Sequence, residues 1–546
     1  MKNFATKILT LFIALIAINY LSDNVYKRFD LTKDKRYTLS ETTKNILEKI
    51  EEPALIEIYL EGDFPSEFKR LQIETKQHLE ELKAINKHIK FRFINPTSIA
   101  EKLIKRGLQP SRLSVQEGGK VSEAIIFPWA TISYKNKKEN ISLLASQTFT
   151  SQEKQLQSSV ENLEYAFSDA IHKISSEKKQ KIAIIKGNGE LQDIYLAGFL
   201  TKLKTYYSLA PFTLDSVLNN PQKTLQELSD FDLAIIAKPT IKFKEQEKFV
   251  LDQFITNGGK TLWLIDNVNA EQDSLMQTGQ TLAFNRDLNL TDLLFSYGVR
   301  LHYDLIKDIQ STTIRLASGN SGNQTQFQDF PWHYFPKITS TNTHPITKNV
   351  DPIRLRFANT IDTLKNGIRK IILLQSSPYA KAIGTPSLIT LDEVAIKPVQ
   401  KDYNKGFQNL GVLLEGEFKS AYATRIKPFE TKQYIEKSKP NKMIVIADGD
   451  IIANETIKGQ PIDLDRDKYT ASHYGNSTFL LNAINYMLDD TGLVQLRSKT
   501  IQLQFLDKKK AYTERTFWQW INVISPLVML LLFGLLFSYL RKRKYR

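Results

Sequence analysis

Residues 181–187, KIAIIKG, begin a series of short apolar segments that decides the fold class of this chain. The series continues with SLAPFTL (208–214), FDLAIIAK (231–238), KTLWLID (260–266), IRKIILLQ (368–375) and KMIVIAD (442–448). Nearly continuous apolar runs of this kind are typical of strands buried on both faces of a parallel sheet. Segments with helical spacing separate or follow them, at residues 191–205, 244–256, 290–297 and 476–488. The alternation predicts an α/β domain with long insertions over residues 178–490.

Residues 23–150 predict a second, smaller α/β domain, which starts with a short helix at 40–50 capped by Ser40. Strands and helices first alternate and then give way to antiparallel strands. The expected strands are 54–60, 89–95, 112–116, 123–134 and 139–144, and the expected helices are 65–87 and 99–107. This order is that of a thioredoxin-like layer. Since the chain has no cysteine, the layer would serve as a scaffold without thiol chemistry.

Residues 151–177 predict one long helix that connects the two domains. Apolar residues recur at helical spacing and form one stripe: Leu156, Val160, Leu163, Phe167, Ile171 and Ile174. The stripe fits a connecting helix or a helix that binds a partner, but packing in the core of the protein is the better interpretation.

Both ends of the chain predict transmembrane helices. Residues 8–21 are apolar and uncharged and no A-x-A cleavage pattern follows, so residues 1–22 predict an uncleaved N-terminal anchor. Residues 518–540 are uncharged over a length sufficient to cross the hydrocarbon core. The residues expected at the membrane interface are Trp518, Trp520, Tyr539 and Arg541.

Lysine and arginine flank both predicted spans on the side of the chain termini, including the basic tail 541–546. The positive-inside rule therefore places both termini in the cytoplasm. Residues from about 22 to 517 are then periplasmic, with 491–517 as a juxtamembrane segment, and the protein lies in the cell inner membrane. The lipid bilayer is accordingly an expected partner.

The composition excludes several classes of function. The 546 residues carry a net charge of +15, part of which lies in the terminal basic flanks, so the remaining excess is too mild to indicate a nucleic-acid-binding protein. The absence of cysteine excludes disulfides, thiolate metal sites and cysteine nucleophiles. No H-E-x-x-H or G-x-S-x-G motif occurs. We therefore expect no catalytic residue, no metal and no cofactor.

Gly258-Gly259-Lys260-Thr261 is similar to a phosphate-binding loop only at first sight. Such a loop needs a strand before it and a helix after it, and here the predicted helix precedes and the strand follows. A helix end and turn is the better interpretation, so the sequence contains no nucleotide-hydrolysing motif. A second cluster, PWHYFP (331–336), is a candidate contact patch or part of the packing of its own insertion.

Four acids are the candidate ligand-binding residues: Glu190, Asp266, Asp448 and Asp450. Glu190 follows the first strand of the larger domain in the turn Gly187-Asn188-Gly189-Glu190, and the aspartates follow two later strands. Ligands of open α/β sheets bind at the carboxyl ends of the strands, so these acids could converge on a cation or a polyol. Alternatively, each acid caps the turn or helix that follows it.

Several stretches together resemble one family. They are KRFDLTKDKRYTLSETTKNIL (27–47), EYAFSDAIHKI…KIAIIKGNGE (164–190), GGKTLWLIDNV (258–268), VIADGDIIANE (445–455) and YGNSTFLLNAINYMLDDTGLVQLRSK (474–499). The chain resembles the GldG-type gliding-motility-associated ABC transporter substrate-binding (auxiliary) proteins of Bacteroidetes. The resemblance implies partnership with an ABC-type permease and a cytoplasmic ATPase subunit. It also implies an amidotransferase-like (flavodoxin-like) fold for the larger domain, without the cysteine that catalysis in that fold requires.

The sequence thus predicts a non-catalytic, doubly anchored extracytoplasmic subunit of an ABC-type complex associated with gliding motility. An alternative is a tethered periplasmic module that binds a glycan or peptide without an ATPase. A membrane-anchored hydrolase that uses the same acids is a third, weaker hypothesis.

Overall fold

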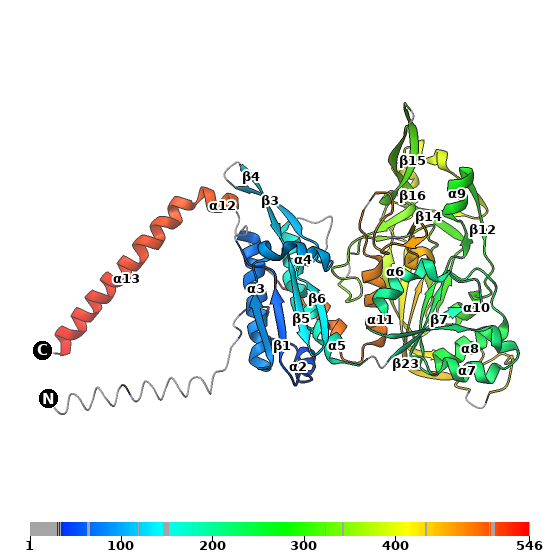
Figure 1. The fold of residues 1–546 in the computed structure, drawn as a ribbon, viewed down its shortest axis with the longest axis horizontal. Coiled ribbons are helices and arrows are strands. Elements are labelled where there is room, and N and C mark those ends of the chain that lie inside the picture. The colour runs from blue at the N-terminus through cyan, green and yellow to red at the C-terminus, as the bar shows by residue number, and fades with distance from the viewer. Residues whose placement is uncertain are drawn as a thin grey trace. The chain divides into compact units, whose positions relative to one another are not determined.

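The computed structural model describes residues 12, 30, 32, 34–62, 66–117, 120–145, 152–177, 180–322, 324–340, 343–431, 434–470, 472–501, 503 and 508–544. The chain forms two compact units, Met1–Thr500 and Ile501–Arg546. The larger unit is a mixed α/β structure with several sheets (Figure 1), as the sequence predicts. The N-terminal anchor expected at residues 1–22 lies outside the described residues, apart from Phe12.

The first sheet has the strand order β2-β1-β5-β6. β1 is parallel to β2 and antiparallel to β5, and β5 is antiparallel to β6. These strands are Ala54–Ile58 (β1), Ile89–Phe93 (β2), Trp129–Tyr134 (β5) and Lys137–Ser142 (β6), and the helices beside them are Glu41–Leu47 (α2), Ser66–Ile85 (α3) and Ala100–Lys105 (α4). Ser40 caps α2 by accepting a hydrogen bond from the backbone N–H of Thr43, which confirms the predicted cap.

The segment 123–134, expected as one strand, is two strands. β4 (Lys120–Ile126) pairs with β3 (Ser111–Glu117) in a separate antiparallel ribbon, and β5 begins only at Trp129. Pro128 lies between them and has no N–H to donate to a ladder, so pairing cannot run through this position. The sequence prediction was wrong because it ignored this break.

The long helix α5 (Gln152–Ser175) buries its apolar stripe inside the larger unit. It contacts α2, α3 and β6, and it also contacts the 3₁₀ helix η6 (Leu493–Ser498) from the far end of the unit. Glu164 of α5 accepts a hydrogen bond from Ser40 N at 2.8 Å and pairs with Lys499 Nζ at 2.8 Å. α5 therefore joins the first sheet to residues near the end of this unit.

The main sheet has the order β19-β22-β23-β10-β9-β7-β8. Its parallel strands are Ser208–Thr213 (β8), Lys181–Lys186 (β7), Leu233–Ala237 (β9), Lys260–Leu264 (β10) and Lys437–Ile446 (β23). Numbered along the chain, these strands lie in the order 2-1-3-4-5, which is a doubly wound arrangement with its switch point between β7 and β9. The predicted parallel sheet is thus present.

Two antiparallel pairings extend this sheet in a way that the sequence did not indicate. β22 (Asn409–Lys419) pairs antiparallel with β23, and β19 (Arg369–Gln375) pairs antiparallel with β22. The segment 368–375, which contains β19, was expected as a further buried strand, and β22 was not expected. Both strands are rich in apolar residues, so composition does not distinguish their pairing direction.

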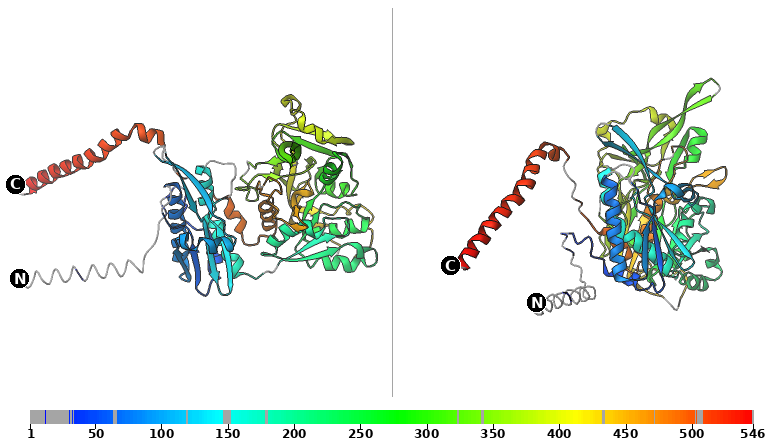
Figure 2. Two further views of the ribbon diagram at one scale, coloured as in Figure 1. Left: turned by 45° about the horizontal axis from the view of Figure 1, so that its top comes forward. Right: turned by 60° about the vertical axis from the view of Figure 1, so that its left-hand side comes forward.

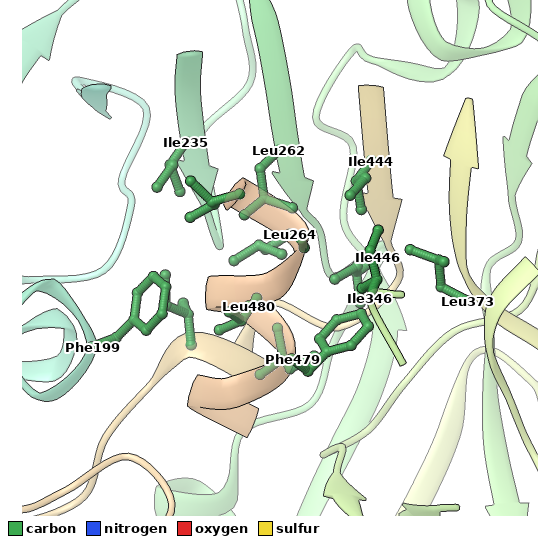
Figure 3. Packing of buried hydrophobic residues seen from close by; sticks show 14 of the residues in the cluster. Phe199, Ile235, Leu262, Leu264, Ile346, Leu373, Ile444, Ile446, Phe479 and Leu480 are labelled. Carbon is green, nitrogen blue, oxygen red and sulfur yellow. The ribbon is translucent and has the colours of Figure 1, made fainter. Parts of the chain in front are cut away.

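Helices cover both faces of the main sheet (Figures 1 and 2). One face carries α6 (Asp193–Leu203) and α11 (Asn476–Leu488), and the other carries α7 (Pro221–Leu228), α8 (Glu245–Thr256) and α10 (Thr291–Ser296). Alternation along β10 explains the two cores, because Leu262 and Leu264 face the first set of helices and Trp263 faces the second. Figure 3 shows the first core, where α11 side chains pack against β9, β10 and β23.

The long insertions contain strands of their own. The insertion between β10 and β19 contains the strands Asp304–Asp308 (β14), Ser311–Ser321 (β15) and Gln324–Ile338 (β16). The β15–β16 hairpin projects from the main-sheet region in Figure 1. In the PWHYFP cluster, Trp332, Tyr334 and Phe335 are each 2% exposed. The contact-patch interpretation was therefore wrong and the packing interpretation is confirmed.

Short elements complete the larger unit. They are Val268–Asn269 (β11), Gln272–Thr278 (α9), Gln280–Asn285 (β12), Val299–Leu301 (β13), Ile353–Arg354 (β17), Ile361–Thr363 (β18), Ala380–Gly384 (β20), Ser387–Thr390 (β21), Thr456–Ile457 (β24) and Gln460–Pro461 (β25), with 3₁₀ helices at Pro96–Ile99, Asp215–Leu218, Leu391–Ala395, Gln400–Asp402 and Asp450–Ile452 (η5).

The smaller unit contains α12 (Lys508–Thr513) and α13 (Arg515–Lys544). Within the described part of the chain, α13 is the helix that is long and apolar enough to cross a membrane. Trp518, Trp520, Tyr539 and Arg541 lie on α13. At 1.5 Å per residue its length exceeds the roughly 30 Å of the hydrocarbon core.

Candidate functional site

The ends of β10 and β23 bring three of the four candidate acids together. Leu264 and Ile446 are direct neighbours in these parallel strands. Asp266 and Asp448 each follow by two residues, so the strand register places their backbones side by side at the carboxyl edge of the sheet. Asp266 Oδ1 accepts a hydrogen bond from Gly449 N at 2.5 Å, and Asp448 Oδ1 accepts one from Asp450 N at 2.7 Å.

A buried lysine occupies the centre of this cluster. Lys238 follows β9 directly, and its ammonium lies 2.8 Å from both carboxylate oxygens of Asp450, 2.8 Å from Glu271 Oε2 and 3.5 Å from Asp266 Oδ2. Lys238 is 5% exposed. The ammonium therefore takes the position that a bound cation would take among these carboxylates.

The lysine fits because its neighbour in space is glycine. A Cβ on Gly449 would lie 2.5 Å from Cγ and 2.6 Å from Cβ of Lys238, closer than carbon atoms approach without repulsion. Lys238 itself has a positive φ of 54°, which is uncommon outside glycine. The absence of a side chain at Gly449 and the positive φ of Lys238 thus allow the lysine side chain to lie under the loop after β23.

The protonation of the aspartates follows from burial and from the lysine. Burial raises the pKa of Asp266 to about 6, although Lys238 opposes the shift. Burial, reinforced by Asp266 and Asp450, raises the pKa of Asp448 well above its usual value. Burial also acts on Asp450, but Lys238 and Arg356 outweigh it and lower its pKa. Burial thus favours the protonated form of Asp448, and Lys238 and Arg356 favour the ionised form of Asp450.

Further ion pairs between acidic and basic side chains surround the cluster. Glu271, which binds Lys238, also pairs with Arg286 Nη2 at 2.9 Å. Beyond Asp448, whose Oδ2 accepts a hydrogen bond from Arg356 N, the Arg356 guanidinium pairs with Glu455 at 2.5 Å. The carboxylates at this edge are therefore engaged by internal partners.

Glu190 is placed apart from the other three acids. Its Oε2 accepts a hydrogen bond from Asn188 N at 2.8 Å within the turn that follows β7, and burial raises its pKa. Gly189 has a positive φ of 71°, and a Cβ there would lie 2.2 Å from Thr240 Oγ1. The tight-turn interpretation of Gly187–Glu190 therefore describes this segment, and among the described residues no hydrogen bond or ion pair joins the Glu190 side chain to the lysine cluster.

Lys238 is the residue that sequence reasoning missed. One signal was present, because Lys238 is a charged residue immediately after β9, whose five residues are all buried. This position, like those of the predicted aspartates, lies at the carboxyl edge of the sheet.

No group of acids and histidines able to hold a metal ion occurs within the described residues. Gly258 N and Gly259 N donate to carbonyls at the end of α8, which confirms that this glycine pair ends a helix.

The fold and the site define a class of protein: a doubly wound α/β body whose carboxyl edge is closed by an internal ion cluster, with a separate apolar helix at its C-terminus. Residues 179–483 match the model of the family described as "ABC-type uncharacterized transport system", and residues 33–133 match a domain of unknown function. The chain belongs to this ABC-type transport system family.

One relative is similar over its whole length. A protein of Borreliella burgdorferi, described as an uncharacterized protein, is 22% identical over 560 residues, which cover 100% of each chain. Among solved structures, the mmIFT52 N-terminal domain is 12% identical, with a TM-score of 0.30 and coverage of 57% of this chain and 98% of that one. The structural likeness is too low to carry an argument. The family indicates association with transporter components and a non-catalytic accessory role.

Proposed function

We propose that this chain is a non-catalytic, membrane-anchored extracytoplasmic subunit of an ABC-type transporter complex. The observation that carries the proposal is the Lys238 ammonium bound by Asp266, Asp450 and Glu271. Enzymes with open α/β sheets place reactive groups at this edge, whereas here the carboxylates neutralise a lysine of the same chain. A carboxyl edge filled by an internal ion cluster suits a domain that recognises a partner or transmits a conformational change, rather than one that catalyses a reaction.

The membrane arrangement completes the proposal. The apolar length of α13 and its basic end, Arg541–Lys544, support a span whose C-terminus faces the cytoplasm. With the N-terminal anchor predicted at residues 1–22, the body between about 22 and 517 would be periplasmic and held at the inner membrane by both ends. The expected partners are a multi-span permease and a cytoplasmic ATPase. The link to gliding motility remains a prediction from the family resemblance.

The strand orders support the finer fold assignments. The order β2-β1-β5-β6, with a parallel β1–β2 pair followed by an antiparallel hairpin, suits a thioredoxin-like scaffold. The 2-1-3-4-5 order of the parallel strands suits an amidotransferase-like (flavodoxin-like) domain. Neither assignment supplies a substrate, since fold alone does not determine function.

The proposal is tested by affinity purification of the full chain from its own cells in mild detergent. We expect an ABC ATPase and a permease to co-purify in amounts comparable to the chain. A chain that ends at Glu514, and so lacks α13, is the control and should lose both partners. A monodisperse wild-type chain without partners would refute the proposal, as would a reporter fusion at residue 300 that is active only in the cytoplasm.

A second candidate function is a tethered periplasmic module that binds a glycan or peptide at the carboxyl edge without an ATPase. Glu190 Oε1 and Asn188 Oδ1 favour it, because both are buried and accept no hydrogen bond within the described residues. A ligand that donates hydrogen bonds would satisfy them. Thermal shifts with glycan and peptide panels, compared between wild type, Glu190→Gln, Asp266→Ala and Asp448→Ala, distinguish this function. Shifts that the variants do not change would reject it.

A further inference from the structure

A cavity of about 540 Å³ lies inside the larger unit, away from the carboxyl-edge cluster. Its walls come from the C-terminal half of α5, the turn between α6 and β8, and the C-terminal end of α11 with the residues that follow. The volume is within the range of small-molecule sites. Because α5 packs on the first sheet and α11 on the main sheet, both α/β parts of this unit contribute to the cavity.

Asp169 of α5 offers an acceptor atom that the protein leaves unused. Its Oδ2 accepts a hydrogen bond from the Tyr206 hydroxyl at 3.2 Å and pairs with Lys173 Nζ at 3.1 Å. Asp169 is 8% exposed, and its Oδ1 is buried without a hydrogen-bond donor among the described residues. A buried carboxylate oxygen without a donor is costly, so a donor supplied by a ligand would stabilise it.

Asn485 of α11 offers the complementary donor. Its Oδ1 accepts a hydrogen bond from the Tyr207 hydroxyl at 2.9 Å, which orients the amide. Among the described residues nothing accepts a hydrogen bond from its Nδ2, and the residue is 6% exposed. A free acceptor on α5 and a free donor on α11 therefore line the same cavity.

The lining also includes charged residues of both signs: Lys49, Lys173, Glu177, Asp489 and Asp490. The Asp489 carboxylate is engaged, because it accepts hydrogen bonds from the backbone N–H groups of Thr491, Gly492 and Val494. Lys173 is already paired with Asp169 and with Glu139, the latter at 2.9 Å, so the cation beside the free oxygen is not available to hold an anion. The Tyr206 and Tyr207 rings stack with centroids 6.1 Å apart, and tyrosine combines an apolar ring with a polar hydroxyl. A hydroxyl group both donates and accepts, so adjacent hydroxyls on one small molecule suit the Asp169 and Asn485 atoms together.

We propose that this cavity binds a neutral, hydroxyl-rich small molecule of mono- or disaccharide size. Asp169 accepts from one ligand hydroxyl, Asn485 Nδ2 donates to another, and the tyrosines border the carbon skeleton. The ligand contacts α5 and α11 at once, and so bridges the two α/β parts of the larger unit. This site is separate from the carboxyl edge and does not depend on the proposed role in transport.

The test is calorimetric titration of the full chain, in a detergent without a sugar headgroup, with glucose, maltose and trehalose as neutral probes. Putrescine and citrate are the cationic and anionic probes. We expect saturable binding of at least one sugar below about 10 mM. Asp169→Asn, which turns the free acceptor into a donor, and Asn485→Leu, which removes the donor at similar volume, should each weaken it about tenfold or more.

Matched controls separate binding from folding. Asp193→Asn on α6, whose side chain is 87% exposed, should bind as the wild type does. If Asn485→Leu fails to fold, Tyr207→Phe tests the same donor, because it releases the amide that Tyr207 orients. This variant should weaken binding while the chain stays folded, with a melting temperature lowered by the loss of one buried hydrogen bond. The proposal is overturned if no sugar binds, if only putrescine or citrate binds, if the cavity variants bind like wild type, or if Glu190→Gln abolishes binding while they do not.

Discussion

Replacing Lys238 with methionine should destabilise the protein strongly and in a pH-dependent way. The side chain is 6% exposed, and its ammonium contacts Asp450, Glu271 and Asp266 at 2.8–3.5 Å. Removing one partner of a buried ion pair leaves uncompensated charge and costs about 3–5 kcal/mol. Methionine retains most of the apolar part of the lysine side chain, so the loss of stability reports the removal of the ammonium charge. We expect the free energy of unfolding to fall by this amount at pH 7.5.

The sign of the pH dependence follows from the carboxylates. In the wild type, Lys238 lowers the pKa of Asp450, so that carboxylate stabilises the fold above its unfolded pKa and the contribution is lost as the pH falls. In Lys238→Met, Asp450 and Asp266 are buried without the cation, and their folded-state pKa values rise above the unfolded values. The variant then loses stability as the pH rises. The difference in the free energy of unfolding between variant and wild type should therefore become smaller from pH 7.5 to pH 4.5.

Urea unfolding of the full chain in mild detergent measures this gap, with the fluorescence of buried Trp263 in β10 as one reporter. Lys242→Met is the matched control, because Lys242 pairs with Asp287 at the surface, where both side chains are more than half exposed, and it should change stability little. Adding Asp450→Asn to Lys238→Met should recover part of the loss. Equal stability of the two lysine variants at pH 7.5, or a gap that does not change with pH, would refute the reasoning.

Three further changes test the same physical account. His78 is buried and its pKa is lowered by burial to about 4, so the contribution of this residue to the free energy of unfolding should rise by about 3 kcal/mol as the pH increases from 4 to 6.5. The pH profile of His78→Phe should lack this contribution, and a profile parallel to that of wild type would contradict the assignment. Asp266, with its pKa raised by burial to about 6, contributes in the opposite sense, and its ionisation should cost about 3 kcal/mol as the pH rises from 3.8 to 6, which offsets the contribution of His78 in wild type. In urea titrations the stability of Asp266→Asn should therefore rise more steeply with pH than that of wild type, and parallel profiles would exclude this role of Asp266. Gly449→Ala should lower the free energy of unfolding by about 1–3 kcal/mol, because the added Cβ displaces Lys238. Gly384→Ala is the control and should lower it much less, because a Cβ there meets nothing within 4 Å. Equal melting temperatures of the two variants would disprove the close approach at Gly449.

The candidate site shows where reasoning from sequence reached its limit. The rule that ligands gather at the carboxyl ends of parallel strands selected Asp266, Asp448 and Asp450, which do lie together. The rule alone could not show that Lys238 neutralises them, because residues 238 and 450 become neighbours only through the strand order of the sheet. Glu190 follows the same rule, but its side chain folds back onto Asn188 N.

Local features of this chain were determined by the sequence itself: the strands β7, β9, β10 and β23, the apolar stripe of α5, the cap at Ser40, the helix end at Gly258 and the apolar length of α13. Each depends on residues within a few positions of one another, and side-chain periodicity and backbone preference act over that range. Only the tertiary structure decided the antiparallel addition of β22 and β19, the burial of the aromatic cluster in β16 and the cavity between α5 and α11. These features depend on which surfaces meet after the chain has folded, and a buried apolar strand has the same composition whichever direction its neighbour runs.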